Sequence, residues 1–357
     1  MTKILVIAEA GVNHNGSVGQ AKRLIDVAAD SGADVVKFQT FTAENVVTHQ
    51  ASKAAYQQET TGTSETQLEM LRRLELSVPD HLELVEHCRD RRIQFLSTPF
   101  DLPAVDFLGG DLAMHTFKIA SGEITNAPLM MKIASYGRPI ILSTGMSDLD
   151  EIRVALGVVA YGLIAPEEPP SLDAFRDVCD SQVGRESLRK HVSLLQCTTS
   201  YPTPFSDVNL RGMDLLEETF GLPVGLSDHS VGVAIPIAAA ARGARIIEKH
   251  FTLDRSLPGP DHLASLEPDE LAAMVAGIRN VEVALGDGSK SPSQSEVVNR
   301  DVARRSLVAS TRISKGDVFD ESNLTTKRPG TGISSILFYD WLGRAAEADY
   351  DEGDLID

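Results

Sequence analysis

The sequence predicts an α/β protein, a (β/α)8 TIM barrel followed by a small, mostly β domain. Eight short apolar, β-branched runs each end in polar or small residues, and segments with helical periodicity usually separate them. The runs are nearly continuously apolar, as in parallel strands that are covered on their outer face. The phosphate-binding patterns G-x-G-x-x-G and G-x-x-x-x-G-K-[ST] are absent, which disfavours a doubly wound open sheet. A closed barrel is therefore expected.

The strands are expected, in chain order, at residues 4–8, 34–36, 93–96, 116–120, 139–142, 192–196, 224–226 and 244–247. Amphipathic helices are expected between and after them. Residues 18–31 place Leu24 and Ile25 on one apolar face, and residues 267–285 do the same with Met274 and Ile278. The repeated strand and helix units fill the first 286 residues, which we assign to the barrel.

Two further regions follow the barrel. Residues 287–298 are rich in Gly, Ser and Pro and are expected to form a linker. Residues 299–357 have little helical periodicity and contain short strand-like runs, such as 306–309, between turn signals. A domain this small is only marginally stable alone, so we expect it to dock on a partner surface.

Charge excludes several classes of function. The 357 residues contain 33 Lys and Arg against 51 Asp and Glu, which gives a net charge of −18. Such a chain is a poor candidate for binding nucleic acid or an anionic membrane surface. Small anionic ligands remain open, because they need only a local positive pocket. No apolar stretch approaches the roughly 20 residues of a membrane helix or resembles a signal peptide, and the three cysteines lack CxxC spacing. We therefore expect a cytoplasmic protein with reduced thiols.

Polar side chains follow the expected strands, and the carboxyl ends of barrel strands meet on the face where active sites lie. Lys37, Lys118 and Lys249 stand at such ends. Hydroxyls and ammonium groups together suit a phosphate or a carboxylate, which predicts an anion site. The hydroxyls in question belong to Thr98, Ser121, Ser143 and Ser227. The alternative is that the lysines form structural ion pairs with Glu9, Glu123 or Glu248.

Two histidines, His229 and His250, end the neighbouring seventh and eighth strands, flanked by Asp228 and Glu248. A pair of imidazoles with open positions suits Mn²⁺ or a similar divalent ion, although a single histidine would more often be a core residue. Glu123 is expected to act either as a general base or as an ion-pair partner. A rigid turn at 258–261 could hold Asp261 over the barrel mouth.

These strand-end motifs resemble the sialic acid synthase family along essentially the whole chain. The matching motifs are IAEAGVNHNG (7–16), VKFQT (36–40), STPF (97–100), KIASGE (118–123), STGM (143–146), YPTP (201–204), GLSDH (225–229) and EKHF (248–251). The resemblance implies condensation of phosphoenolpyruvate with an N-acylated amino hexose to give a nine-carbon 2-keto sugar acid. The C-terminal region, with KRPG at 327–330, resembles the antifreeze-like (SAF) domain of that family.

The resemblance also implies roles for individual residues. Phosphoenolpyruvate would be held by Lys37, Thr98, Lys118, Ser121, Ser143 and Ser227. The amino sugar would be contacted by Glu9, Gln39, Phe100, Thr199, Tyr201, Glu248, Asp261 and Arg328. Glu9, Lys118, Glu123 and Glu248 are the candidate catalytic groups. His229 and His250 would bind the metal, usually Mn²⁺ in this family, with Mg²⁺ and Co²⁺ as alternatives. Arg328 would reach the barrel of a second subunit, which implies a domain-swapped homodimer.

One departure bears on the sugar. Sialic acid synthases commonly have Asn where this chain has Thr199, and residues 53–57 and 67–71 resemble the branch that makes N,N'-diacetyllegionaminate. The sugar is thus N-acetylmannosamine or, the favoured alternative, a 2,4-diacetamido-6-deoxy hexose. Two rival functions remain. One is another phosphoenolpyruvate-dependent barrel or a Schiff-base aldolase that uses Lys118 as nucleophile, and the other is a carbohydrate- or ice-binding module without catalysis.

Overall fold

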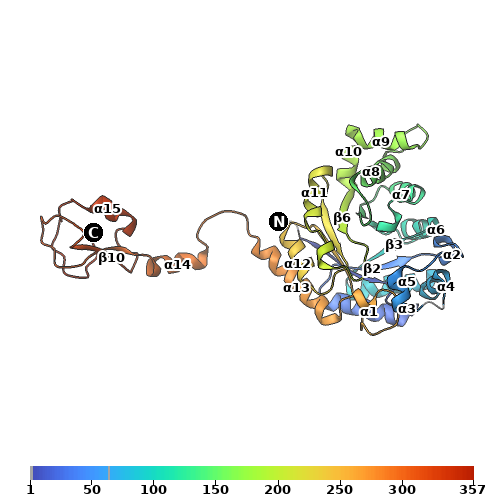
Figure 1. The fold of residues 1–357 in the computed structure, drawn as a ribbon, viewed down its shortest axis with the longest axis horizontal. Helices are drawn as coiled ribbons and strands as arrows, with labels where there is room; N and C mark the ends of the chain where they lie inside the picture. Colours follow the sequence, from blue (N-terminus) through green and yellow to red (C-terminus); the bar gives the residue numbers. More distant parts are fainter. Residues whose placement is uncertain (1–2, 63–64) are drawn as a thin grey trace. The chain divides into compact units, whose positions relative to one another are not determined.

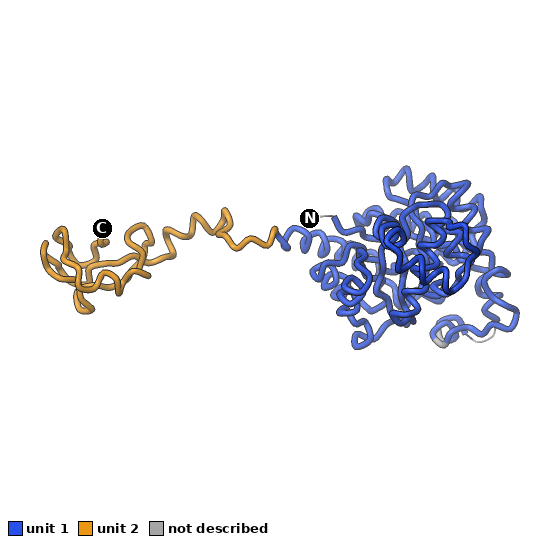
Figure 2. Tube along the Cα trace, turned by 90° about the horizontal axis from the view of Figure 1, so that it is seen from above, with its two compact units in different colours: residues 1–286 blue, residues 287–357 orange. Residues whose placement is uncertain are grey.

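The computed structural model describes residues 3–62 and 65–357, and the chain divides into two compact units, Met1–Gly286 and Asp287–Asp357 (Figure 2). In the first unit the parallel strands are surrounded by helices (Figure 1). The eight strands have the order β3-β2-β1-β8-β7-β6-β5-β4, and the two end strands, β3 and β4, also contact each other. The predicted (β/α)8 architecture is confirmed.

The strands begin where the apolar runs predict but several of them continue further. They are β1 (Leu5–Gly11), β2 (Val35–Thr40), β3 (Gln94–Pro99), β4 (Phe117–Ile119), β5 (Ile140–Ser143), β6 (Val192–Cys197), β7 (Val224–Asp228) and β8 (Ile246–His250). The additional residues are the polar ones at the carboxyl ends, because backbone pairing continues after the apolar pattern stops. Several of the candidate site residues, such as Glu9, Lys37 and Glu248, are therefore held within ladders rather than on free loops.

Helices cover the outside of the barrel. They are α1 (Val18–Asp30), α5 (Val78–Arg91), α6 (Leu102–Asp106), α7 (Ala127–Ala134), α8 (Leu149–Ile164), α9 (Leu172–Asp180), α10 (Gln182–His191), α11 (Arg211–Phe220), α12 (Ala234–Ala241) and α13 (Pro268–Ala284). Both helices predicted from periodicity, α1 and α13, are confirmed. Helix α1 starts after Ser17, whose side chain accepts a hydrogen bond from the backbone of Gln20, and buries Leu24 and Ile25 completely.

Close packing between β7 and β8 depends on one glycine. A Cβ at Gly225 would lie 2.2 Å from the carbonyl oxygen of Ile246 in β8, and no side chain fits at that distance. Around this contact the strands are buried on both faces, as Val6 and Ile7 illustrate with no exposed surface. Replacing one such side chain by alanine costs about 2–5 kcal/mol of stability. The barrel thus gives the strand ends a rigid base.

The connection between β2 and α5 is the long insertion 42–77, which we call the cap. It contains α2 (Ala43–Val46), α3 (Ala55–Thr61) and α4 (Gln67–Leu74). The hydroxyl of Thr66 accepts from the backbone of Glu69, whose carboxylate in turn accepts from the backbone of Thr66, a capping box that starts α4. The Nζ of buried Lys53 donates to the hydroxyl of Thr61 at 2.9 Å and to the carbonyl of Gly62 at 2.6 Å. These bonds fix the end of α3.

The second unit has its own core, built from residues such as Leu307, Phe319 and Tyr350. Its elements are α14 (Gln294–Ala303), β9 (Ser306–Ala309), β10 (Leu324–Lys327) and α15 (Phe338–Trp341), and β9 pairs antiparallel with β10. Helix α14 begins inside the segment expected to be linker, because Ser293 and Glu296 form a capping box there. Within the described residues, no helix is long and apolar enough to cross a membrane.

Candidate active site

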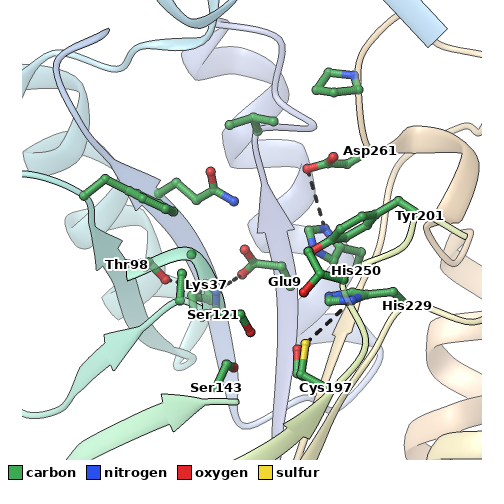
Figure 3. A pocket seen from close by; sticks show the side chains of 18 of the residues that line it. Glu9, Lys37, Thr98, Ser121, Ser143, Cys197, Tyr201, His229, His250 and Asp261 are labelled. Carbon is green, nitrogen blue, oxygen red and sulfur yellow. Dashed lines mark hydrogen bonds and ion pairs between the residues drawn. The ribbon is translucent and has the colours of Figure 1, made fainter. Parts of the chain in front are cut away.

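A cavity of about 230 Å³ opens at the carboxyl ends of the barrel strands. It is lined by all the residues that the sequence assigns to substrate or metal except Arg328, and by every candidate catalytic group except Glu123. These residues come from all eight strands or the loops that directly follow them, as expected for a barrel. Figure 3 shows their side chains converging on one space.

The register of the parallel strands explains this convergence. Glu9 of β1 is the ladder partner of both Lys37 in β2 and His250 in β8, and Ser227 of β7 is the partner of Glu248. Paired residues in neighbouring parallel strands point to the same side of the sheet. Charged and hydroxyl groups that are far apart in the sequence are thereby placed side by side inside the barrel mouth.

One side of the cavity carries two buried ammonium groups. Lys37 Nζ lies 3.1 Å from Thr98 Oγ1 and 2.8 Å from Glu9 Oε2, and Lys118 Nζ donates to Ser143 Oγ at 2.6 Å. The Ser121 hydroxyl, on the same side in Figure 3, accepts from the backbone N–H of Gly145 at 3.0 Å. Ammonium groups beside hydroxyls and a backbone N–H are suited to phosphate or carboxylate oxygens.

The same lysines also form the ion pairs that the sequence offered as an alternative, and these pairs leave the anion site as a prediction. Glu248 lies between them, with Oε2 3.6 Å from Lys37 Nζ and Oε1 3.7 Å from Lys118 Nζ, and it accepts from Ser227 Oγ at 2.8 Å. Burial lowers the pKa of Lys37, but Glu248 and Glu9 more than offset it and hold that pKa above its usual value. Burial also lowers the pKa of Lys118, and there the carboxylates do not restore it.

The two buried glutamates differ in their proton affinity. Burial raises the pKa of Glu9 to about 7, with Lys37 opposing the shift and Glu248 adding to it. For Glu248, burial acts in the same upward direction, but Lys118 and Lys37 outweigh it and hold the pKa below the usual value. Two neighbouring carboxyl groups with separated pKa values are typical of sites where one stays ionised and the other exchanges a proton near neutral pH.

The opposite side of the cavity holds the histidine pair. The rings of His229 and His250 have centroids 5.4 Å apart, and Tyr201 contacts both, at 4.1 Å and 5.7 Å. The Nδ1 of His229 donates to the carbonyl of Thr198 at 2.8 Å, so in the neutral ring Nε2 carries the free lone pair. Burial lowers the pKa of His229, but Cys197 and the Thr198 carbonyl outweigh it and hold that pKa above its usual value. A backbone acceptor of this kind commonly orients metal-binding imidazoles.

The histidine pair fits a divalent cation. Nδ1 of His250 is buried without a hydrogen-bond partner and lies 4.0 Å from Asp261 Oδ2. Burial and the neighbouring His229 hold the pKa of His250 well below its usual value, which favours the neutral imidazole that a metal requires. Among the described residues no three His, Cys, Asp or Glu side chains form a ready-made metal cluster. Two protein nitrogens are therefore what the chain offers, and other ligands would come from water or substrate.

Three strand-end groups lie elsewhere than the sequence suggests. Lys249 is fully buried on the other side of β8, where it pairs with Asp228 at 2.5 Å, so neither residue lines the cavity. The reason is the alternation of strand side chains, which turns Lys249 away from Glu248 and His250. Glu123 also lies off the cavity and accepts from Asn126 Nδ2 at 2.7 Å. It therefore belongs to the start of α7 and not to the cavity wall.

Arg328 is exposed and belongs to the second unit. Cys197 lines the cavity, with Sγ 3.9 Å from Nδ1 of His229. It is a free, buried thiol, as are Cys88 and Cys179, which agrees with the expected reduced state.

The cap supplies the lining residues that strand-end reasoning overlooked. They are Tyr56, Gln57, Met70, Leu71 and Leu74. Tyr56 stacks on Tyr201 with centroids 5.0 Å apart, which links α3 to the histidine side of the cavity. The signal available in the sequence was the length of the connection between the second and third strands, which exceeds what one helix needs.

Comparison with known proteins gives a consistent picture. The NeuB family matches residues 24–290 and the SAF domain matches residues 304–356. The chain is 49% identical over 356 residues to N,N'-diacetyllegionaminic acid synthase of Campylobacter jejuni, covering 100% of this chain and 99% of that protein. It is 45% identical over 331 residues to the synthase of the same name from Legionella pneumophila, covering 92% and 86%. A crystal structure of N-acetylneuraminic acid synthetase from Leptospira borgpetersenii, in complex with citrate, is 32% identical with a TM-score of 0.68, covering 84% of this chain and 90% of that one.

Proposed function

The chain belongs to the NeuB family, and from this premise we propose that it condenses phosphoenolpyruvate with an open-chain N-acyl amino hexose to form a nonulosonic acid and phosphate. The observation that carries the proposal is the single cavity that joins two lysines and their hydroxyls to a pair of histidines. A module that only binds carbohydrate has no need of such a combination. Release of phosphate that requires both substrates is the direct test.

The preferred sugar in this proposal is 2,4-diacetamido-2,4,6-trideoxymannose, and the product is N,N'-diacetyllegionaminate. The support is the full-length identity of 49% to the Campylobacter jejuni synthase. A panel that compares this hexose with N-acetylmannosamine, with phosphate release as the readout, tests the choice. Higher kcat/KM for N-acetylmannosamine would overturn the proposed sugar and leave the reaction class intact.

In this proposal Lys37 and Lys118, with the hydroxyls around them, bind the phosphate and carboxylate of phosphoenolpyruvate. C3 of phosphoenolpyruvate then attacks the aldehyde carbon of the sugar, which leaves a cation at C2, and Glu9, with a pKa of about 7, donates a proton to the aldehyde oxygen and so forms the new hydroxyl. The deprotonated Glu9 can then accept the proton that the attacking water loses. Water adds to C2 with loss of a proton, and the bond between C2 and the phosphate oxygen breaks. In heavy-oxygen water the label should enter the keto acid, whereas label in the phosphate would contradict C–O cleavage.

We further propose that His229 and His250 hold a divalent ion, with Mn²⁺ preferred, whose chemistry would be to polarise the aldehyde oxygen. The surrounding residues keep both imidazoles in place through Thr198 and Tyr201. Dialysis against a chelator should abolish turnover, and added Mn²⁺ should restore it. His229→Ala should lose Mn²⁺ binding in a calorimetric titration, and unchanged binding in that variant would overturn the assignment.

The proposal also includes a homodimer in which Arg328 of one subunit completes the cavity of the other. The support is the exposure of Arg328, together with the large apolar side chains Ile336 and Tyr339, which are 85% and 77% exposed in the same unit. Mixing inactive Arg328→Ala with inactive His229→Ala under subunit exchange should restore activity, because one mixed site would be intact. No recovery after verified exchange would place the arginine in its own subunit's site.

A further inference from the structure

An apolar surface faces the cavity beside the charged groups that bind phosphoenolpyruvate in the proposed function. It consists of Val12, Met70, Leu71, Leu74 and Phe100, which we call the apolar wall. These residues belong to one contiguous hydrophobic cluster, separate from the barrel core. No side chain in the wall can donate a hydrogen bond or accept a strong one. The reaction mechanism uses none of them.

The wall is built from two regions that fit closely together. Val12 follows β1 and Phe100 follows β3, while the other three residues come from α4 of the cap. The end of α4 is seated against Gly16, where a Cβ would lie 2.3 Å from the carbonyl oxygen of Arg73 and the φ angle is +73°. Only glycine permits this approach. The position of the wall is therefore fixed by packing and is not left to a free loop.

Phe100 and the α4 residues of the wall, which belong to one cluster, lie across the cavity from His229. In the strand order, β3 and β7 are four places apart among eight strands, so Phe100 follows a strand opposite the one that His229 follows. The aldehyde carbon must lie near the histidines and phosphoenolpyruvate. The sixth carbon is the far end of an open-chain hexose, so it extends toward the wall.

We propose that the apolar wall binds the C6 methyl group of a 6-deoxy hexose and thereby selects this sugar against its 6-hydroxy counterpart. This inference rests on the proposed function. A methyl group buries apolar surface against the wall, whereas a hydroxyl there loses water and gains no partner. Apolar pockets discriminate against an added hydroxyl by roughly up to 100-fold.

The test uses two sugars that differ only at C6, namely 2,4-diacetamido-2,4,6-trideoxymannose and 2,4-diacetamido-2,4-dideoxymannose. The wild-type protein should show kcat/KM roughly 10- to 100-fold higher for the 6-deoxy sugar. Leu71→Asn, which places an amide in the wall at a half-buried position, should reduce this ratio about tenfold. Leu68→Asn is the matched control, because Leu68 is buried on α4 but does not line the cavity. It should lower both kcat/KM values equally.

The outcomes separate the two proposals. Turnover of both sugars with equal kcat/KM in the wild-type protein would overturn the wall's role and leave the synthase function standing. Equal ratios in Leu71→Asn and the wild-type protein would also overturn it. Turnover of neither sugar would overturn the proposed sugar and, with it, this inference, and phosphate release with N-acetylmannosamine then decides whether the synthase function stands. The wild-type ratio needs no variant, so the test holds even if a substitution prevents folding.

Discussion

At the scale of single residues, the main finding is that the cavity lysines are partnered before any ligand arrives. Lys37 and Lys118 face Glu9 and Glu248, so two positive and two negative side chains alternate within a few ångströms. Pairing is what allows four ionisable groups to be buried together, because an isolated charge would be too costly to desolvate. An anion entering the cavity therefore meets cations that are already oriented by their carboxylate neighbours.

Gly145 gives a prediction about the anion side. A Cβ there would lie 2.5 Å from Thr199 Oγ1 and 2.8 Å from Ser121 Oγ, so alanine must push both hydroxyls out of place. We expect Gly145→Ala to lower kcat/KM for phosphoenolpyruvate by about tenfold, in line with small misplacements in other active sites. Because both hydroxyls can rotate, the free energy of unfolding should change by only about 1 kcal/mol or less.

The control for this variant is Gly110→Ala, where the added Cβ would meet only the Tyr136 hydroxyl at an ordinary 3.8 Å. Gly110 is exposed and does not line the cavity. This variant should keep wild-type kinetics. Similar losses in both variants would show that a general effect of removing glycine, and not displacement of the hydroxyls, is responsible.

His14 links stability to pH. Burial lowers its pKa to about 4 from the usual 6.5, with His81 and His262 lowering it further and Asp80 opposing them. Between these values the unfolded chain binds more protons than the folded one, so the free energy of unfolding falls as the pH falls. From pH 8 to pH 5 this histidine should account for a loss of about 2 kcal/mol.

Urea unfolding of the wild-type protein and His14→Asn at both pH values measures this effect. The Asn side chain can still accept the hydrogen bond that the backbone of Gly16 donates to His14 at 3.0 Å. The variant should lose less stability than the wild-type protein on going to pH 5. Equal losses in the two proteins would assign the pH dependence to other groups.

At the scale of elements, the cap depends on a lysine that the sequence does not distinguish from a surface residue. Lys53 is 6% exposed and joins the end of α3 to Glu65, at 3.4 Å, just before α4. Lys53→Met should leave the carbonyl of Gly62 and the Glu65 carboxylate without this donor. We expect the cap to loosen, which would raise KM for the sugar about tenfold and leave the affinity for phosphoenolpyruvate nearly unchanged.

Hydrogen exchange in α3 and α4 should accelerate in the same variant, which a change confined to sugar contacts would not cause. Lys22→Met is the matched control, since Lys22 pairs with Glu83 on the surface. It should alter neither exchange in the cap nor KM. An unchanged KM in Lys53→Met would show that the cap keeps its form without this lysine.

The elements also show how much of the barrel and of the cavity lining the sequence predicts. Every barrel strand was predictable, because a strand buried on both faces is marked by continuous apolar residues, as in 139–142. The ends of the strands beyond the apolar pattern were harder to predict. The sequence grouped Lys249 with the two cavity lysines, whereas its side chain lies on the other side of β8, because side-chain alternation depends on the register with neighbouring strands. Residues 53–57 and 67–71 of the cap bore on the sugar only through the family resemblance, and their contact with the cavity was not predicted because it is long-range. Tyr56 meets Tyr201, which is far away in the chain.

At the scale of the whole molecule, the charge of −18 surrounds a cavity whose buried lysines and glutamates balance. Anionic phosphoenolpyruvate should therefore be repelled at long range, contrary to the steering seen in positively charged proteins. Because salt screens this repulsion, kcat/KM for phosphoenolpyruvate should rise a few-fold when the ionic strength increases from about 10 to about 150 mM. The value for the uncharged sugar should stay constant. A decrease with salt for phosphoenolpyruvate would show that the lysines dominate the field outside the cavity.

The placement of the cap in a single connection has a consequence for how such enzymes diversify. The cap leaves the barrel after β2 and returns at α5, and its side chains form most of the apolar wall. The lysines proposed to bind phosphoenolpyruvate lie on barrel strands outside the cap, and the two histidines lie on or directly after such strands. Substitutions within the cap alone can therefore change the sugar preference, while the residues proposed for the condensation reaction stay the same. Grafting residues 42–77 between related synthases is a rational route to new nine-carbon acids.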